Sequence, residues 1–492
     1  MTRAAAARVA AIGGLVAACL CGPAWWAGEL VGSPGAETLG HAWVQAWASA
    51  AWPAWPSGTE SAAGASSWPV IDPLPTWIIA GAARVIGLTA AWNLLVAAGI
   101  VVAAVGGARL AKAAGGAPLF GAVAVPLMPV YLGSLTSGLT EDAMIGVVAL
   151  ALANALEGRW VRAGVWCGFA AWCGLYLGWM AGIGVAAIGI RAAKPAEILR
   201  SGPRMVGGAL LALTLGLGAA APFAGQIQAS SVARPAPPPH EEFWRVNPWR
   251  GADVASFVSP GKVALEGAVL REHPVYLGFA TVALAAVGGT PVGWGAAAVC
   301  VLVAPGDDLV LAGSPLGIHN PAATALHALP FGDRFRNHAR LMLVGQVVLV
   351  AMASRGIARL RSVHRALPVV ATLLVVAEVV WCSPARAPLP GTPAESPGIY
   401  AALAAAPAEL PVRVVGAHNP QQPLFDQRAH GRRLLNNPNR PDPGRPHPES
   451  EIVVAFGEAV PRLTVELGVP DVVVADAAAW WPPNASETSA PP

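Results

Sequence analysis

The chain has 492 residues, of which 55% are hydrophobic and only 12% are charged, and its mean hydropathy is +0.53. Soluble globular chains carry about 25% charged residues, so this composition excludes a single soluble domain, and it equally excludes a disordered chain. The formal net charge of +3 is too small to indicate nucleic-acid binding. The composition therefore predicts an all-α polytopic membrane protein.

Apolar runs long enough to cross a bilayer recur along the chain as far as residue 383. A bilayer core of roughly 30 Å needs about 20 apolar residues per helix. We expect about 11 transmembrane helices, at 9–28, 89–108, 117–136, 139–156, 160–176, 177–192, 205–225, 273–289, 292–312, 340–358 and 366–383. The apolar segment 73–88 is shorter and contains Arg84, so we expect a helix that lies against the outer surface of the membrane, with a true span as the alternative.

The basic residues indicate how these helices are oriented. They gather near the N-terminus and in four turns, at 109–116, 157–162, 191–204 and 355–365, whereas 29–72 contains no Lys or Arg. The positive-inside rule places the basic turns in the cytoplasm. We therefore expect a multi-pass protein of a bacterial inner membrane, with a cytoplasmic N-terminus and an extracytoplasmic C-terminal region. A lipoprotein-like signal cleaved before Cys19 is the alternative, but the apolar run continues to Trp26, which favours an uncleaved span.

The chain divides into two expected domains. Residues 1–383 form the transmembrane domain, with external loops at 29–88, 226–272 and 313–339, and residues 384–492 form a small C-terminal α/β domain outside the membrane. Eight of the 19 tryptophans lie between residues 25 and 77. Because Trp prefers the headgroup level, we expect the long first external loop to follow the membrane surface. In the tail we expect strands at 410–415, 451–456 and 471–475, and helices at 400–406 and 459–467.

Two clusters of ionisable residues lie at the predicted outer ends of the early spans. Glu37 and His41 are four residues apart, so on a helix they share a face and can act together as a base toward an acceptor hydroxyl. The alternative is that they are ordinary polar residues of an aqueous loop. Glu141 and Asp142 lie between two spans, where they suit a cation or a sugar hydroxyl, or else stabilise the first turn of a helix capped by Thr140.

Three arginines precede a late span on the same predicted outer side. Arg334, Arg336 and Arg340 run against the positive-inside trend, and guanidinium groups bind phosphate oxygens well. Lipid headgroups would be bound by the same physics, so a specific phosphate site and a headgroup contact both stay open. The pair Asp307-Asp308 is a weaker signal, of the kind that binds metal ions.

Several motifs are absent from the sequence. All six cysteines lie in apolar stretches, and no CxxC or Cys/His cluster with zinc spacing occurs. From the cysteines we therefore expect neither a metal site nor a disulfide framework. A Walker loop, GxSxG and HExxH are also absent, so ATP hydrolysis and serine hydrolysis are not supported.

The order of these features resembles the GT-C superfamily of integral-membrane glycosyltransferases, which includes the polyprenyl-phosphate-mannose mannosyltransferases and many bacterial relatives. The resemblance lies in five stretches: Gly35–Trp43, with Gly35-Ala36-Glu37 after the first span; Leu135–Glu141; Phe335–Arg340 before a late span; and, in the tail, Gln427–Arg432 and Leu467–Val474. The family usually has Asp at the Glu37 position, often with an acidic neighbour, whereas Ala36 and Thr38 flank Glu37 in this chain.

The resemblance implies a function and assigns roles to residues. It implies transfer of a sugar from a polyprenyl-phosphate-linked donor to an extracytoplasmic acceptor, with Glu37, beside His41, activating the acceptor. Membrane lipid and the lipid-linked donor are the implied partners, and the donor phosphate would be held by arginines, with Arg336 and Arg340 as first choices and Arg334 beside them. Glu141 would contact substrate. A divalent cation assists in some relatives, and Asp72 and Asp142 would hold it.

Two other functions are compatible with the sequence. A transporter or flippase of lipid-linked substrates would have ionisable residues at mid-span and broken helices, whereas most spans here have apolar centres. A non-catalytic membrane scaffold, whose tail binds a partner, is the other alternative. The sequence indicates neither the sugar, nor the acceptor, nor the oligomeric state.

Overall fold

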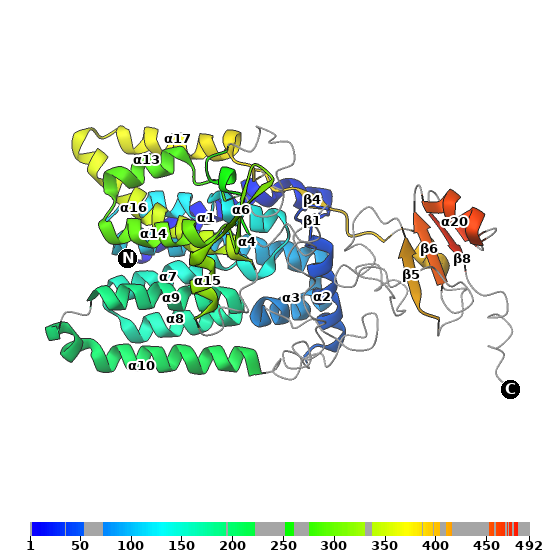
Figure 1. The fold of residues 1–492 in the computed structure, drawn as a ribbon, viewed down its shortest axis with the longest axis horizontal. Helices are drawn as coiled ribbons and strands as arrows, with labels where there is room; N and C mark the ends of the chain where they lie inside the picture. The colour runs from blue at the N-terminus through cyan, green and yellow to red at the C-terminus, as the bar shows by residue number, and fades with distance from the viewer. Residues whose placement is uncertain are drawn as a thin grey trace.

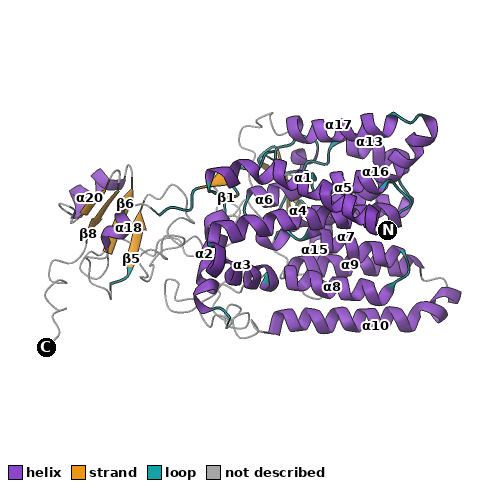
Figure 2. Cartoon of the chain, turned by 180° about the vertical axis from the view of Figure 1, so that it is seen from behind, coloured by secondary structure: helices purple, strands orange, loops and turns teal. Residues whose placement is uncertain are grey.

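The computed structural model shows a bundle of helices with a small mixed α/β lobe near the C-terminus (Figure 1). It describes residues 2–34, 36–53, 72–192, 195–221, 251–259, 275–329, 337–385, 387–396, 398–403, 410–415, 452–456, 459–467, 470, 472–474 and 477–480. The long helices, such as α8, α9, α10 and α17, run roughly along one direction in both views, whereas α2 lies across them (Figures 1 and 2).

The first half of the chain supplies most of the long helices. They are α1 (Arg3–Ala27), α4 (Leu88–Ala113), α7 (Ile145–Leu156), α8 (Trp160–Cys173), α9 (Leu175–Ala192) and α10 (Pro195–Ala220). Thr2 caps α1 by accepting a hydrogen bond from the Ala5 amide at 3.2 Å, and Gly28, at φ 71°, ends it. Glycines let α4 and α7 pack closely, because a Cβ added at Gly106 would clash with the Gly146 carbonyl oxygen.

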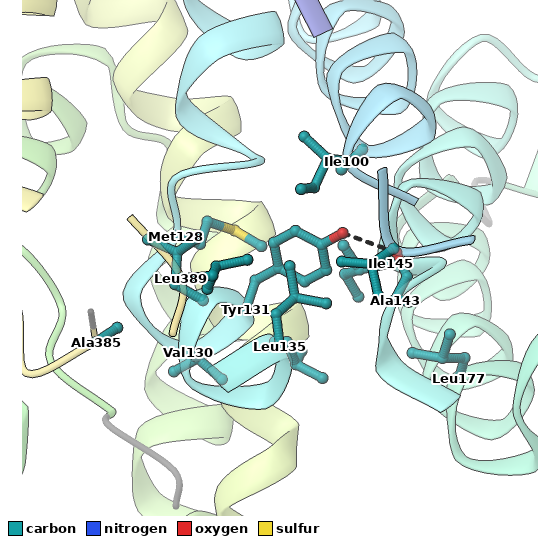
Figure 3. Packing of buried hydrophobic residues seen from close by; sticks show 14 of the residues in the cluster. Ile100, Met128, Val130, Tyr131, Leu135, Ala143, Ile145, Leu177, Ala385 and Leu389 are labelled. Atoms are coloured by element: carbon teal, nitrogen blue, oxygen red, sulfur yellow. Dashed lines mark hydrogen bonds between the residues drawn. The ribbon is translucent and has the colours of Figure 1, made fainter. Parts of the chain in front are cut away.

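The expected span 117–136 is two short helices that follow one another, α5 (Pro118–Ala124) and α6 (Pro129–Thr136). Proline lacks an N–H and disfavours helical geometry in the preceding residue, and Pro126 and Pro129 lie at this break. The Tyr131 hydroxyl of α6 donates to the Ala143 carbonyl at 2.8 Å from within a packed apolar core (Figure 3). The broken segment is therefore anchored to the bundle by both packing and a buried hydrogen bond.

The expected helix at 292–312 is shorter in the structure. Helix α14 (Pro291–Val303) ends just before Pro305-Gly306, and a hairpin of β2 (Asp308–Leu311) and β3 (Ser314–His319) follows. The prediction was wrong for 304–312 because the apolar residues after the proline pair in a strand. The neighbouring elements are the 3₁₀ turn η4 (Val254–Phe257), α13 (Phe279–Gly288), α15 (Pro321–His327), the 3₁₀ turn η6 (His338–Leu341), α16 (Met342–Val363) and α17 (Leu367–Cys382).

Five of the described helical segments are long and apolar enough to cross a membrane: Arg3–Ala27, Leu88–Ala113, Pro118–Thr136, Gly202–Ala220 and His338–Val363. Five shorter apolar helices accompany them: Pro73–Ile86, Leu175–Ile190, Phe279–Gly288, Pro291–Val303 and Leu367–Cys382. These helices support a multi-pass membrane protein, while the number eleven stays a prediction. Segment 73–88 forms a helix, α3 (Pro73–Ile86).

The segment 29–88, expected to be the first external loop, is structured in its described residues 29–34, 36–53 and 72–88. Strand β1 (Leu30–Val31) pairs antiparallel with β4 (Gly391–Thr392), so the start of the tail lies against the start of this loop. The Asn93 side chain accepts from the Val31 amide at 2.9 Å and donates to the Glu29 carbonyl at 2.8 Å. Helix α2 (Thr38–Ala51) follows, with residues Thr38–Gln45 buried.

The C-terminal lobe contains a four-stranded mixed sheet in the order β5-β6-β8-β7. Strands β5 (Val412–Val415), β6 (Ile452–Phe456) and β7 (Val472–Val474), with α18 (Gly398–Ala402) and α20 (Ala459–Leu467), confirm the expected α/β elements. Strand β8 (Ala477–Trp480) was not predicted, because alanine has a low strand propensity. It pairs antiparallel with both β6 and β7 in the sheet.

Candidate functional site

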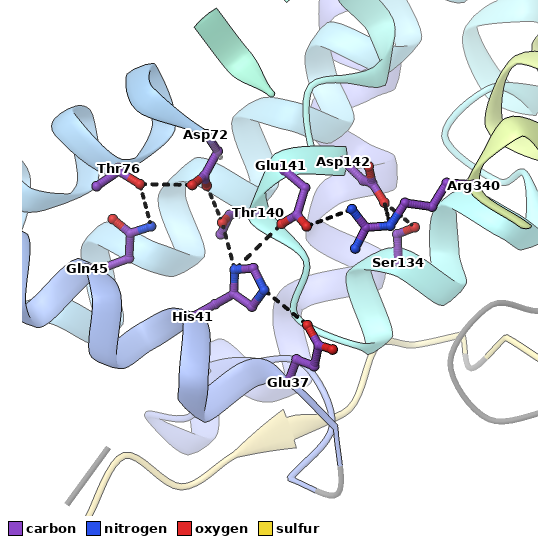
Figure 4. Close-up of polar contacts among 10 residues, drawn as sticks. All are labelled: Glu37, His41, Gln45, Asp72, Thr76, Ser134, Thr140, Glu141, Asp142 and Arg340. Carbon is purple, nitrogen blue, oxygen red and sulfur yellow. Dashed lines mark hydrogen bonds and ion pairs between the residues drawn. The ribbon is translucent and has the colours of Figure 1, made fainter. Parts of the chain in front are cut away.

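A network of ionisable side chains connects α2 to the start of α16. It contains Glu37, His41, Asp72, Glu141, Asp142 and Arg340, with the polar neighbours Gln45, Thr76, Ser134 and Thr140 (Figure 4). Glu37 immediately precedes α2, and His41 lies one turn into that helix. The two side chains meet as the i,i+4 spacing predicts, with His41 Nε2 and Glu37 Oε2 3.3 Å apart.

The second ring nitrogen of His41 faces the segment between α6 and α7. His41 Nδ1 lies 3.6 Å from Glu141 Oε2 and 3.5 Å from Thr140 Oγ1. Both residues belong to the 3₁₀ turn η1 (Thr140–Asp142), which Gly174 approaches so closely that an added Cβ would lie 2.7 Å from the Glu141 carbonyl oxygen. A glycine at the start of α9 therefore lets this turn sit deep in the bundle.

Asp72, which immediately precedes α3, accepts hydrogen bonds from two hydroxyl groups. The Thr140 hydroxyl donates to Asp72 Oδ2, and the Thr76 hydroxyl donates to Oδ1 at 3.0 Å. Gln45 on α2 donates to Thr76 at 3.1 Å. This arrangement joins α2, α3 and η1 through one carboxylate.

Arg340 completes the network from η6. Its Nη1 atom lies 2.8 Å from Glu141 Oε1, and its Nε atom lies 3.8 Å from Asp142 Oδ2. Ser134 donates to the same Asp142 oxygen at 2.8 Å, and the guanidinium carbon lies 5.3 Å from the centre of the Tyr176 ring. Arg340 is thus the cationic partner of two adjacent carboxylates, Glu141 and Asp142.

Burial separates Glu37 from the other carboxylates of the network. Asp72, Glu141 and Asp142 are at most 3% exposed, whereas the Glu37 side chain is 40% exposed. Buried charges are stable only when they are paired and hydrogen-bonded. His41 and Arg340 supply that pairing for Glu141 and Asp142, and two hydroxyl groups hold Asp72. Glu37 is therefore the carboxylate that a molecule outside the bundle can reach.

The surrounding charges determine the protonation of His41. Burial by itself lowers the pKa of this imidazole, but the nearby carboxylates of Glu141, Glu37 and Asp72 outweigh that effect and raise the pKa to about 9. Burial, together with the charge of Glu141, raises the pKa of Asp72 above its ordinary value. At neutral pH His41 is therefore an imidazolium, which donates hydrogen bonds and cannot accept a proton.

The structure brings together six of the eight predicted site residues, drawn from segments up to 303 positions apart, between Glu37 and Arg340. Arg334 and Arg336 lie outside the described residues. Ser134, Thr76 and Gln45 were not singled out from the sequence, because lone hydroxyl and amide side chains in apolar segments carry no recognisable spacing. The roles assigned to the charged residues stay predictions.

The network as arranged does not fit a divalent cation between Asp72 and Asp142. Both oxygens of Asp72 accept hydroxyl hydrogen bonds, Arg340 lies against Asp142, and Glu141 stands between the two aspartates (Figure 4). Mg²⁺ and similar ions require several oxygen ligands directed at one point. No chemical step below passes through an ion at this position, and the two aspartates as metal ligands stay a prediction.

The sequence matches no protein-family model and no curated protein, but solved structures are similar to this chain over most of its length. Arabinofuranosyltransferase AftD from Mycobacteria is 16% identical with a TM-score of 0.49, and the match covers 84% of this chain and 31% of AftD. The Archaeoglobus fulgidus oligosaccharyltransferase is 13% identical with a TM-score of 0.48, with 91% of this chain and 68% of that chain covered. ArnT from Cupriavidus metallidurans, bound to undecaprenyl phosphate, is 15% identical with a TM-score of 0.45, with 97% of each chain covered.

These three proteins are GT-C glycosyltransferases, the superfamily that the sequence resembles. At these identities, and at TM-scores below 0.5, the likeness by itself carries no argument about this chain. The function proposed next therefore depends on the side chains of this chain.

Proposed function

We propose that this chain is a glycosyltransferase of the GT-C type, which transfers a sugar from a polyprenyl-phosphate donor to an acceptor outside the bacterial inner membrane. The observation that carries the proposal is the position of Glu37. It is the exposed carboxylate of an otherwise buried charged network, and its partner His41 is held from the other side by Glu141. A structural ion-pair network has no need of a carboxylate that is 40% exposed.

In this proposal Glu37 acts as the general base. Its carboxylate takes the proton of the acceptor hydroxyl as the acceptor oxygen attacks the anomeric carbon of the sugar. The bond between that carbon and the phosphate oxygen breaks, and polyprenyl phosphate leaves with the electron pair. The imidazolium of His41 keeps Glu37 ionised and oriented, so His41 is a positioning residue.

Arginines would stabilise the negative charge that develops on the leaving phosphate. Arg334, Arg336 and Arg340 are the residues that the sequence offers for this role. Arg340 already contacts Glu141 and Asp142, so its charge is matched before substrate binds. We therefore assign the direct phosphate contact first to Arg334 and Arg336, with Arg340 at the edge of the site and Glu141 keeping it in place.

The donor lipid would lie against the apolar outer faces of the bundle. Large apolar side chains are exposed along α10 and α17, among them Leu210, Leu213, Leu217, Leu373 and Leu374. In water such continuous surface would be unfavourable, whereas in a bilayer it contacts acyl chains. Membrane lipid and a polyprenyl chain are chemically equivalent partners for these faces.

The test is sugar transfer by membranes that contain the wild type or Glu37→Gln. The substitution keeps the size of the side chain and removes the base, so we expect transfer to fall by about 10²- to 10⁴-fold. Labelled polyprenyl-phosphate sugars would be supplied at matched expression levels. Glu395→Gln is the matched control, because Glu395 is an exposed glutamate in the described tail and should leave transfer unchanged.

The other outcomes discriminate among the possible functions. Equal transfer by the wild type and Glu37→Gln would keep the transferase and discard Glu37 as the base. An absence of transfer by the wild type across a panel of donors would contradict the proposal and favour a scaffold. Movement of the labelled lipid between leaflets without sugar transfer would favour a flippase.

A further inference from the structure

Outside this network, three metal-ligating side chains converge between α14 and α16. Asp307 follows α14, His327 is the last residue of α15, and His338 begins η6. One ligand atom from each side chain lies within 4.8 Å of the other two. This is the one such group of three found within the described part of the chain.

The distances suit a shared ion. His327 Nε2 lies 2.9 Å from Asp307 Oδ1, and the rings of His327 and His338 are 5.1 Å apart at 78°. Ligand atoms around one tetrahedral ion, at bond lengths of about 2.0–2.2 Å, are separated by roughly 3.4 Å. Small side-chain rotations would therefore place all three atoms around one point.

The backbone that carries Asp307 is fixed by Asn320. The Asn320 side chain donates to the carbonyls of Leu302 and Gly306, both at 2.8 Å. The backbone N–H of Asn320 donates to the Asp307 carbonyl at 2.7 Å. The same side chain accepts from the Ala322 amide at the start of α15. One buried asparagine thus holds the turn of Asp307 against the helix that ends in His327.

We propose that Asp307, His327 and His338 bind a divalent transition-metal ion, with Zn²⁺ as the best match. Two imidazoles and one carboxylate suit zinc and its neighbours in the first transition row, and they suit Mg²⁺ or Ca²⁺ poorly. The His327 and Asp307 side chains are 32% and 24% exposed, so water can complete the coordination. His338 is 1% exposed and supplies the ligand on the buried side.

The ion would connect the turn after α14 to η6, two residues before Arg340. Because Arg340 contacts Glu141 and Asp142, the metal site would help to hold the charged network in position. It shares no side chain with that network, so binding of the metal does not depend on the proposed glycosyl transfer.

The test measures metal bound to the full-length protein, purified in detergent without a polyhistidine tag. After exposure to Zn²⁺ and removal of free metal, elemental analysis should find about one ion per chain. Co²⁺ serves as the spectroscopic probe, and nitrogen and oxygen ligands in a site of low coordination number should give visible absorption bands. Zn²⁺ should also raise the apparent melting temperature, as does any ligand that binds the folded state alone.

Three variants identify the ligands. His327→Ala and Asp307→Asn lie at the exposed side of the group, where they should preserve the fold, and each should lower Zn²⁺ affinity by at least about 10-fold. His319→Ala is the matched control, because His319 is 60% exposed and lies near Asp308 outside the group, and it should bind as the wild type does.

Two results would overturn the proposal. One is wild-type protein that retains no Zn²⁺ above the level of His327→Ala and shows no cobalt bands. The other is metal that persists in both ligand variants and disappears in Glu141→Gln, since the ion would then lie in the charged network.

Discussion

The two polar clusters of this protein differ in how their charges are balanced. In the charged network four carboxylates surround His41 and Arg340, which are cations at neutral pH, and the buried members are held by hydroxyl groups from several elements. In the second cluster one carboxylate faces two imidazoles, with two of the three side chains partly exposed. The first cluster contains its own cations, whereas the second cluster offers ligand atoms to a bound metal ion.

The difference indicates that the charged network organises a site with its own side chains, whereas the second cluster is suited to binding a ligand. A network that contains its own cations can hold Glu37 in one orientation without a bound ion, because His41 and Arg340 are covalent parts of the chain. The aspartate and two histidines gain most when a metal occupies the space between them. Removing a cation should therefore be costly in the charged network, and removing the metal should be milder in the second cluster.

Arg340→Ala should give the largest effect. It leaves Glu141 and Asp142 buried without their cation, and loss of one partner of a buried pair costs about 3–5 kcal/mol. We expect a large fall in the apparent melting temperature in detergent, measured by intrinsic tryptophan fluorescence. Arg159→Ala is the comparison, since Arg159 pairs with Glu157 at 3.0 Å but is 49% exposed and should cost less than about 1 kcal/mol. Similar falls in both variants would show that the network is not specially dependent on its cation.

The protonation of His41 predicts a pH dependence of stability. Its pKa in the folded protein is raised from 6.5 to about 9. A raised pKa contributes stability that is fully present below about pH 6.5 and is lost as the pH rises through about 9, on the order of 3 kcal/mol in total. Melting temperatures measured from pH 6 to about pH 10 should fall for the wild type.

His41→Gln should flatten this decline, because glutamine does not titrate. Asp72 remains in the variant, and its pKa, which the charge of His41 lowers, should rise further when that charge is lost. The difference between the two curves therefore reports His41 together with the carboxylate coupled to it. Parallel curves for the wild type and His41→Gln would contradict an imidazolium at this position.

Ser134→Ala should give the smallest effect within the network. The serine is buried and donates to Asp142 at 2.8 Å, and a hydrogen bond to a charged group contributes about 1.5–3 kcal/mol. Ser362→Ala, which removes an exposed bond to the Arg359 carbonyl, should change stability by less than about 0.5 kcal/mol. An equal response of the two serine variants, measured by thermal unfolding, would indicate that Asp142 does not depend on this hydroxyl.

The sequence predicted local structure well where one physical signal dominated. Apolar runs located the helices, and the spacing of Glu37 and His41 placed both on one face, where they meet at 3.3 Å. It failed at Pro305 within 292–312, where a proline follows the end of the helix and the apolar residues after it pair in a strand. The expected span 117–136 was found, although it is divided into two short helices at Pro126. A hydropathy average over many residues hides a single proline, whereas that proline removes a backbone hydrogen bond and can end a helix.

The pairing of charges in the network could be recognised only in the tertiary structure, although most of its members were singled out from the sequence. Glu141 was expected to contact substrate, and in the structure it is 1% exposed between His41 and Arg340. Of the group proposed to bind a metal, the sequence singled out Asp307 alone, as half of the acidic pair Asp307-Asp308. Spacing rules search for ligands close in sequence, whereas Asp307, His327 and His338 span 32 residues.

By itself the sequence determined that this is a helical membrane protein, that a small α/β lobe follows the helices, and which ionisable residues lie near the ends of the apolar runs. Those properties follow from local composition and periodicity, which each segment carries alone. Only the tertiary structure decided which charges pair, which carboxylate stays exposed and which histidines meet. Those outcomes depend on the burial and electrostatics of segments that come together after the helices pack.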